Sequence, residues 1–257
     1  TPATRAAAER DSAMTNGRFL ALEGSDGAGK TTLARHLADL TYEQAAHLLI
    51  HESDADPDHC LVFVSRRQIS ATSPYSAALM DHIATMLWHS GDSPDLPDSF
   101  WVPLQTSWFT AHATTVVAPL LAAGFDVILD GWVYKFFSKL LLQGYHQPEL
   151  DTVFSRVRMP DEVVLLTADA AILYDRRPDQ FRPAELGMHA GYDDLGRDTF
   201  ITYQTRGQQQ LLAMAERHGW ADLHVEAQET AADTLARLAP IVTELRRRET
   251  PSPVGGM

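Results

Sequence analysis

Five short apolar runs alternate with amphipathic stretches along the chain. The runs are rich in Val, Ile and Leu, are bordered by polar or turn residues, and are typical of buried strands. They occupy residues 18–23, 61–64, 126–129, 162–167 and 222–225. Apolar positions at helical spacing predict helices between them. These helices are expected over residues 30–46, 75–89, 100–123, 200–215 and 235–245. The alternation predicts an α/β fold in which helices cover both faces of a five-stranded parallel sheet.

The ends of the chain and two internal segments lack this patterning. Residues 1–16 and 249–257 are small, polar and contain Pro or Gly, so we expect flexible tails around a single domain over 17–248. Residues 90–99 and 178–198 are the long loops that the pattern leaves between helices and strands.

Composition and charge limit which ligands and cellular surroundings fit this chain. The 257 residues are 45% hydrophobic, which is enough for one sizeable core. A formal net charge of −13 argues against binding of a nucleic acid polymer through its phosphates, although a small anionic ligand remains compatible. Cys60 is the single cysteine, which excludes an internal disulfide and fits a reducing compartment. With no run of 18 apolar residues, we expect a soluble cytoplasmic protein without membrane contact.

A glycine-rich motif follows the first apolar run. Residues 24–31, GSDGAGKT, match the P-loop (Walker A) pattern G-x-x-x-x-G-K-[ST] between a predicted strand and a predicted helix. Its backbone N–H groups are expected to hold ATP phosphates, with Lys30 bridging the β- and γ-phosphates and Thr31 binding Mg²⁺. The expected cofactor-binding residues are Gly24, Ser25, Asp26, Gly27, Ala28, Gly29, Lys30, Thr31 and Thr32. The alternative is a glycine turn without a ligand, and GTPases, ATPases and kinases all contain the motif.

The wider sequence resembles thymidylate kinases. Residues 19–32, FLALEGSDGAGKTT, are similar to that family's apolar strand followed by E-G-x-D/E-G-x-G-K-T-T. Residues 127–134, VILDGWVY, lie where the family has an apolar strand ending in Asp-Arg-Tyr or Asp-Arg-His. Residues 163–169 and Arg176-Arg177 resemble a strand, the following helix and an arginine-bearing lid. The resemblance covers about residues 18–245 and becomes less specific after the P-loop.

The resemblance implies a P-loop kinase fold with five parallel strands, ATP and Mg²⁺ at the loop, an acceptor site facing it, and a lid at about 176–198. Arg176 and Arg177 would stabilise the charge on the transferred phosphoryl group, with Arg182 in the same lid. The alternative for these arginines is a solvated polar loop. Asp130 would hold Mg²⁺ or polarise the attacking oxygen. Lys30, Asp130, Arg176 and Arg177 are thus the expected catalytic residues, and Thr31 and Asp130 the expected metal ligands.

Three departures concern the acceptor. Gly131 stands where the family has an arginine, and Arg66-Arg67 lacks the Glu-Pro-Gly that follows the family's arginine at that place. Phe109 and His112 occupy a family Asp-Arg-x-x-His stretch of which only the histidine remains. Cations that would grip a nucleoside 5′-monophosphate are therefore replaced by glycine or an aromatic residue, while the ATP side is intact.

Other residues are candidates for the acceptor site. Aromatic side chains around Phe109 and Trp132 would stack on a flat group, or belong to the core. Lys135 would replace the cation missing at Gly131, and Asp26 would approach the acceptor sugar or stabilise its own loop. The expected substrate-binding residues are Asp26, Arg66, Arg67, Phe109, Trp132 and Lys135. Residues 51–60 contain acidic and histidine side chains without metal-site spacing, so they are expected to form a solvated turn.

Three functions follow from these patterns. We favour an ATP-dependent kinase acting on a modified nucleoside, nucleotide or related small molecule in specialised metabolism. The alternative is a genuine dTMP kinase that makes dTDP. A non-catalytic P-loop protein that binds ATP to regulate a partner is the third possibility. The acceptor, the attacking group and the oligomeric state are not encoded in recognisable motifs, although a homodimer is compatible with the family.

Overall fold

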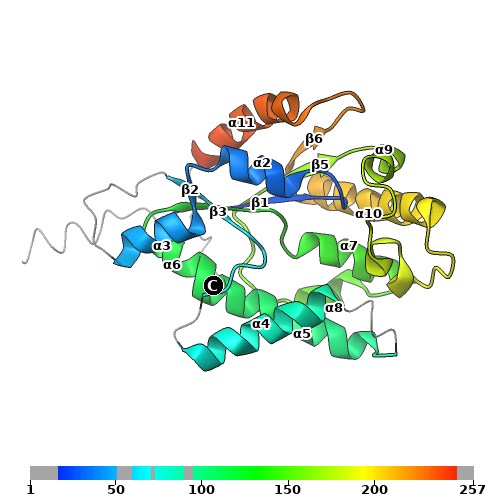
Figure 1. The fold of residues 1–257 in the computed structure, drawn as a ribbon, viewed down its shortest axis with the longest axis horizontal. Helices are drawn as coiled ribbons and strands as arrows, with labels where there is room; N and C mark the ends of the chain where they lie inside the picture. Colours follow the sequence, from blue (N-terminus) through cyan, green and yellow to red (C-terminus); the bar gives the residue numbers. More distant parts are fainter. Residues whose placement is uncertain (1–16, 51–59, 71–72, 90–94, 248–257) are drawn as a thin grey trace, which may run out of the picture.

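A single parallel sheet organises the chain (Figure 1). The computed structural model describes residues 17–50, 60–70, 73–89 and 95–247. The strands are β1(Phe19–Gly24), β2(Leu40–Thr41), β3(Leu61–Val64), β4(Asp126–Leu129), β5(Glu162–Thr167) and β6(Ala221–His224). Their order across the sheet is β2-β3-β4-β1-β5-β6, and every neighbouring pair is parallel. The carboxyl ends of the central strands therefore meet at one edge, where ligands bind in open α/β sheets.

Helices cover both faces of the sheet. They are α2(Lys30–Leu37), α3(Tyr42–Ile50), α4(Pro74–Trp88), α5(Asp98–His112), α6(Ala118–Ala122), α7(Tyr134–Leu142), α8(Gln147–Val153), α9(Ala170–Asp175), α10(Arg197–His218) and α11(Ala231–Arg247). A π-helical turn, η2(Ala113–Val117), joins α5 to α6. Helices α2 and α11 lie on one side of the sheet, and α4 to α8 lie on the other (Figure 1).

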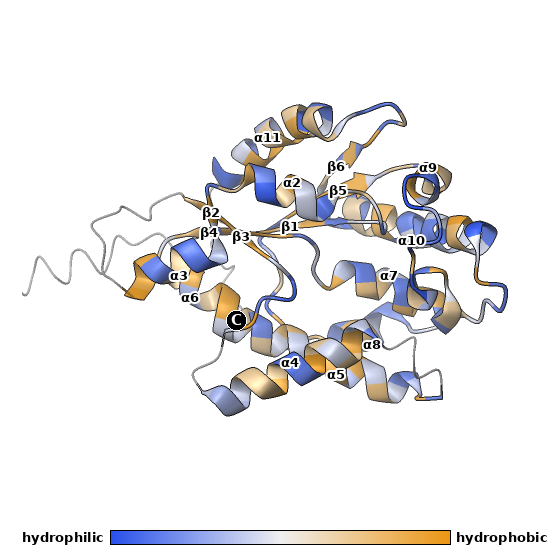
Figure 2. Cartoon of the chain, viewed as in Figure 1, coloured by the Kyte–Doolittle hydropathy of each residue, from blue (hydrophilic) through white to orange (hydrophobic). Residues whose placement is uncertain are grey.

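The two cores follow from the alternation of side chains along each strand. Leu20 and Leu22 of β1 point toward α2 and α11, and they belong to a cluster that includes Leu33 and Leu238. Phe19 and Ala21 point the other way, into the larger cluster formed with α5, α6, α7 and α10. Both faces of the central strands are buried, and Figure 2 shows these strands mostly in the hydrophobic colour.

The predicted parallel sheet is confirmed, with one strand more than expected. The helix predicted over 30–46 is wrong, because two-residue strand β2 divides it into α2 and α3. Asp39 makes this break: its N–H donates to Leu61 O at 2.8 Å, and its carboxylate accepts the Leu61 N–H at 2.9 Å. At the start of α3 the Thr41 N–H donates to Gln44 Oε1, and the Gln44 N–H donates to Thr41 Oγ1. Hydrogen bonds of these polar side chains therefore end the helix at a place where the leucine spacing alone predicts that it continues.

The remaining predicted helices are present. Those expected over 75–89, 100–123, 200–215 and 235–245 correspond to α4, to α5 with η2 and α6, to α10 and to α11. Helices α7 and α8 were not predicted. Residues 176–198, the segment expected to form the lid, contain two short 3-10 turns, η3(Pro183–Glu185) and η4(Met188–Ala190). The predicted tails, residues 51–59 and part of loop 90–99 lie outside the described residues.

Candidate functional site

The P-loop connects the end of β1 to the first turn of α2. Gly24, Gly27 and Gly29 all have positive φ, at 141°, 87° and 81°. At Gly24 a Cβ atom would lie 2.1 Å from Leu166 O of the neighbouring strand, so only glycine fits there. The loop therefore curls at the amino end of α2, where free backbone N–H groups and the helix dipole favour an anion.

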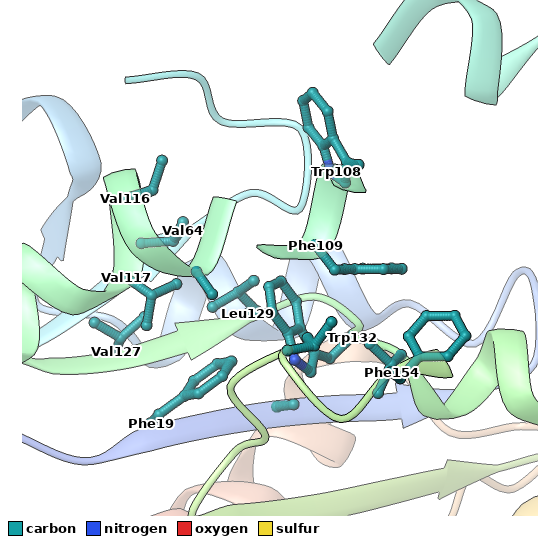
Figure 3. Packing of buried hydrophobic residues seen from close by; sticks show 14 of the residues in the cluster. Phe19, Val64, Trp108, Phe109, Val116, Val117, Val127, Leu129, Trp132 and Phe154 are labelled. Atoms are coloured by element: carbon teal, nitrogen blue, oxygen red, sulfur yellow. The ribbon is translucent and has the colours of Figure 1, made fainter. Parts of the chain in front are cut away.

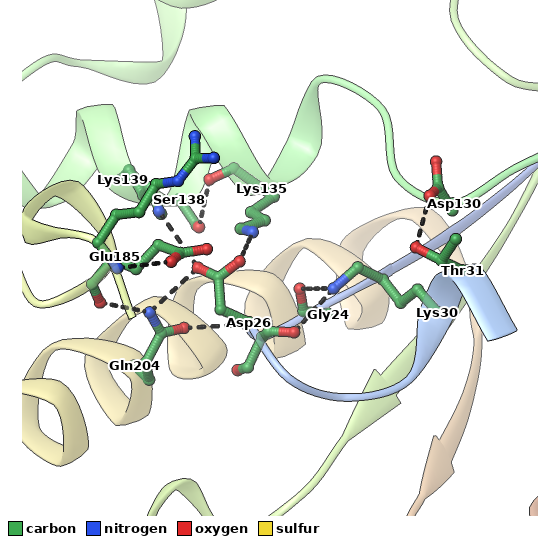
Figure 4. Close-up of polar contacts among 12 residues, drawn as sticks. Gly24, Asp26, Lys30, Thr31, Asp130, Lys135, Ser138, Lys139, Glu185 and Gln204 are labelled. Atoms are coloured by element: carbon green, nitrogen blue, oxygen red, sulfur yellow. Dashed lines mark hydrogen bonds and ion pairs between the residues drawn. The ribbon is translucent and has the colours of Figure 1, made fainter. Parts of the chain in front are cut away.

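Lys30, Thr31 and Asp130 meet beside this loop (Figure 4). The buried Lys30 ammonium donates to Gly24 O at 2.9 Å and to Ser25 O at 2.7 Å. Thr31 Oγ1 donates to Asp130 Oδ2 at 2.6 Å, and the Arg66 N–H donates to Asp130 Oδ1 at 3.1 Å. Burial lowers the pKa of Lys30, although the Asp26 carboxylate opposes that effect. The carboxyl ends of β1, β3 and β4 thus bring a cation, a hydroxyl and a carboxylate together.

Asp26 turns from the loop toward α7 and α10. Its carboxylate forms a close ion pair with Lys135 and lies 3.4 Å from Lys139 Nζ. Gln204 of α10 fixes it from the other side: Asp26 N–H donates to Gln204 Oε1, and Gln204 Nε2 donates to Asp26 Oδ2, both at 3.2 Å. Burial alone would raise the pKa of Asp26, but the attraction of Lys135, Lys139 and Lys30 outweighs it and holds the pKa well below its usual range. Asp26 is therefore a carboxylate locked by cations.

Sequence reasoning missed Lys139 and Gln204. Lys139 follows Lys135 by four residues, the spacing that places both on one face of a helix, but α7 itself was not predicted. Gln204 lies in the middle of α10 and carried no sequence signal. Burial lowers the pKa of Lys135 to about 7, against the attraction of Asp26. The pKa of Lys139 is raised, because the attraction of Asp26 and other oxygen groups outweighs its burial.

A cavity of about 370 Å³ opens next to these residues. It is walled by α4, α5, α7, the lid and α10. Its cationic lining residues are Arg66, Arg67, Lys135, Lys139, Arg177 and Arg182, and its acidic ones are Asp98 and Glu185. Its aromatic lining residues are Trp88, Trp101, Trp108, Phe109, Phe136 and Tyr203. Cations outnumber carboxylates around an aromatic space, which favours a flat and negatively charged ligand.

The expected acceptor residues are distributed unequally around this cavity. Arg66, Arg67, Phe109 and Lys135 line it, whereas Asp26 and Trp132 do not. The Trp132 ring is only 1% exposed, and its centroid lies 4.9 Å from that of the Phe109 ring in an edge-on contact. Figure 3 shows the two rings beside each other. Its indole N–H donates to Arg158 O at 2.9 Å. Trp132 thus supports the cavity wall from behind, and Phe109 faces both the core and the cavity.

The cations nearest β3 gather at the end of α4. The Arg66 and Arg67 guanidinium carbons lie 5.9 and 4.8 Å from the centre of the Trp88 ring, within cation–π range. Arg182 reaches over from the lid and donates to the Trp88 carbonyl. Burial lowers the pKa of Arg67, and repulsion from Arg66 and Arg182 lowers it further. An anionic ligand would relieve this repulsion.

Arg176 and Arg177, the adjacent arginines expected in the lid, point in different directions. Arg177 lines the cavity, with its guanidinium carbon 5.2 Å from the centre of the Phe181 ring. Arg176 instead reaches the carbonyls of Glu226 and Ala227, each at 3.4 Å. The structure therefore places Arg177 and Arg182 beside the cavity and separates Arg176 from them.

Glu23 is a buried site residue whose role sequence reasoning missed. Its Oε1 accepts the N–H groups of Trp132 at 2.9 Å and Tyr134 at 3.2 Å, so it fixes the turn between Asp130 and α7. Its Oε2 has no hydrogen-bond partner in the described structure. Burial raises the pKa of Glu23. The signal was a carboxylate inside an apolar strand, the kind of position that a charged residue seldom occupies without a partner.

The described ranges contain neither a membrane-spanning helix nor a cluster of metal-binding side chains. None of the described helices combines the length and apolar character needed to cross a membrane. The described residues also contain no group of three or more His, Cys, Asp and Glu side chains that would hold a metal ion. The acidic stretch 51–59 is outside those residues, so its expected turn remains a prediction.

Comparisons with known proteins point to one family. The thymidylate kinase of Xanthomonas campestris pv. campestris (strain B100) is 31% identical over 153 residues, which cover 58% of this chain and 56% of that protein. The probable thymidylate kinase of Pyrococcus horikoshii is 27% identical over 150 residues, covering 58% of this chain and 64% of that protein. The matched segments thus span less than two thirds of the length of these relatives. No protein-family model matches the chain.

A solved structure agrees with the sequence comparison. The thymidylate kinase of Ehrlichia chaffeensis superposes with a TM-score of 0.56 over 88% of this chain and 99% of its own, at 14% identity. Similarity at that identity establishes the fold alone. The chain is therefore thymidylate kinase-like in fold, and its sequence is similar to that family over more than half of its length, as the motifs predict.

Proposed function

We propose that this chain is an ATP- and Mg²⁺-dependent phosphotransferase acting on a small nucleotide-like acceptor. The observation that carries the proposal is the 2.6 Å contact between Thr31 and Asp130 beside the buried Lys30, at the edge of a cationic and aromatic cavity. A binding module for ATP alone would not need a second cavity next to the loop. The thymidylate kinase names of its relatives support the same reaction class.

The donor end fits MgATP. The curled loop offers N–H groups to the phosphates, and Lys30 is held by loop carbonyls at the point where it would bridge them. Thr31 Oγ1 and Asp130 Oδ2 are the hard oxygen donors that Mg²⁺ prefers, and a P-loop site needs few protein ligands because phosphate oxygens and water complete it. Bound Mg²⁺ would neutralise charge that develops on the phosphates.

The acceptor end fits an anion attached to a flat group. Arg66, Arg67 and Arg182 converge on Trp88, and such clusters recognise phosphate oxygens. An ionised phosphate oxygen of the acceptor would attack the γ-phosphorus, and ADP would leave, with no proton to be removed. Arg177, on the lid side of the cavity, would stabilise charge on the transferred group. A hydroxyl acceptor would instead need Asp130 to accept its proton.

The finer proposal is that the acceptor is a modified nucleoside or nucleotide rather than plain dTMP. Gly131 has no side chain, and the cations nearest to the acceptor come from Arg67, Arg182, Lys135 and Lys139 instead. The second candidate is a genuine dTMP kinase, which the names of the relatives favour. An ATP-binding regulator is the third candidate, against which the acceptor-like cavity argues.

A panel of acceptors separates these functions. The protein is incubated with ATP, Mg²⁺ and single nucleosides or nucleotides, and ADP and the phosphorylated product are measured together. Turnover of a modified nucleotide well above that of dTMP is the expected result. Rapid and preferential turnover of dTMP would select the second candidate. ATP binding without product for any member of a broad panel would exclude the proposed reaction.

A further inference from the structure

The chain contains only three lysines, and all three surround one carboxylate. They are Lys30, Lys135 and Lys139, and the remaining cationic side chains of the sequence are arginines. Each of the three lysines attracts the buried Asp26 carboxylate. Arginine and lysine are not interchangeable, because an ammonium is a compact point charge with three donors. Lysine thus occurs only in this cluster, where the P-loop, α7 and the cavity meet.

One carboxylate does not balance these charges. Lys30 is held by the loop carbonyls, which leaves Lys135 and Lys139 to share Asp26. Glu185 attracts Lys139 from a longer distance, and its own carboxylate accepts the Arg182 N–H. The Lys135 and Lys139 side chains are only 9% and 20% exposed. A surplus ammonium in such a place is costly unless an anion joins it.

The lysine pair and the arginines that surround Trp88 are bound to different carboxylates. Figure 4 shows Lys135 and Lys139 with Gln204 and Glu185 on one side of Lys30, and Thr31 with Asp130 on the other. The Arg66 N–H is bound to Asp130 on the second side, whereas the Arg182 N–H is bound to Glu185 on the lysine side. The lysines and the arginines line the same cavity. The cavity therefore offers positive charge to an anion both at the lysine pair and at the arginines beside Trp88.

We propose that Lys135 and Lys139 form an anion subsite that recognises a second negatively charged substituent on the acceptor, a carboxylate or a phosphate, in addition to the phosphate held at the arginines. This inference rests on the proposed function and specifies its acceptor as a nucleotide with one extra anionic group. Asp26 positions the two ammonium groups, and Tyr203, whose ring centre is 5.6 Å from Lys139 Nζ, forms the adjoining wall.

Titration calorimetry with matched nucleotides tests this subsite. The probes are dTMP against thymidine 3′,5′-bisphosphate, and uridine 5′-monophosphate against orotidine 5′-monophosphate; each pair differs by one anionic group. We expect at least one of the more charged probes to bind wild-type protein about tenfold to a hundredfold more tightly than its partner, as a charged hydrogen bond predicts. Lys139→Met should abolish that preference, and Lys139→Arg, which keeps the charge but not the compact ammonium, should keep part of it.

The controls separate an anion subsite from a structural clamp on the P-loop. Arg237→Met removes a cation from α11, on the other face of the sheet, and should leave the preference unchanged. Lys135→Met is the second variant should Lys139→Met fail to fold. Equal binding of both members of each pair to wild type would overturn the subsite, as would weakening of both members alike by the lysine variants. Absence of ADP formation with every acceptor, with the binding preference intact, would refute the phosphotransfer and leave the subsite standing.

Discussion

The phosphate-binding loop and the acceptor cavity are built in different ways. The loop is made by backbone within eight successive residues, and its shape is fixed by glycines whose φ angles other residues seldom adopt. The cavity is assembled from side chains of α4, α5, α7, the lid and α10, which are distant in the sequence. A site made by local backbone leaves a motif, whereas a site made by scattered side chains can change its ligand without leaving one.

Lys30→Ala, in the ATP-binding loop, should cause the largest loss of activity. Loss of the ammonium that bridges the phosphates is expected to reduce kcat by at least about 10³-fold. ADP release under saturating ATP and acceptor measures the change. Thermal unfolding should show a folded protein, because Gln204 and Lys135 still hold Asp26 of the loop. Turnover within tenfold of wild type would contradict the role of Lys30.

Arg66→Gln should affect the acceptor end alone. Because Arg66 lies beside the cavity and not in the P-loop, we expect the acceptor KM to rise about tenfold to a hundredfold and the ATP KM to change by less than about twofold. Initial rates with each substrate varied in turn give both constants. Arg237→Gln on α11 is the matched control and should change neither. A parallel rise of both KM values would mean that the two ends are not independent.

Sequence reasoning succeeded where structure is local. The strand, loop and helix over residues 19–37 follow from apolar spacing and glycines, and the structure has them within one residue of the predicted start of the strand. The break at Asp39 depends on contacts with β3, so leucine spacing could not predict it. Lys139 and Gln204 become site residues only because α7 and α10 pack against the loop. Spacing also gave no means to tell Arg176 from Arg177, or Trp132 from Phe109.

Trp132→Phe tests whether Trp132 stabilises the core without contacting the acceptor. The smaller ring leaves a gap beside Phe19 and Phe109 and removes the indole hydrogen bond to Arg158 O. We expect the free energy of unfolding to fall by about 1–2 kcal/mol, measured by urea denaturation. The acceptor KM should stay the same, since Trp132 does not line the cavity. A large rise in KM at unchanged stability would place this ring in contact with the acceptor.

The buried His112, next to the acceptor cavity, makes folding stability depend on pH. Its Nε2–H donates to Ser65 O at 3.1 Å next to Arg66, and Nδ1 has no partner in the described structure. Burial lowers its pKa from 6.5 to about 4, because a proton on Nδ1 would be buried without an acceptor. Between those two pH values the unfolded chain binds a proton that the folded chain refuses, so folding stability falls as pH decreases through this window.

His112→Gln removes the titrating group and so measures how much of the loss of folding stability at acidic pH comes from His112. Wild type should lose up to about 1.4 kcal/mol more stability per pH unit than the variant between pH 6 and 4.5, as urea denaturation at each pH would measure. Above pH 7 the difference between the two proteins should be constant, because the histidine is neutral in both states. Parallel stability curves through the acidic window would mean that the His112 pKa is not depressed. A converging pair of curves would confirm that a neutral imidazole supports the Ser65–Arg66 turn from behind the cavity.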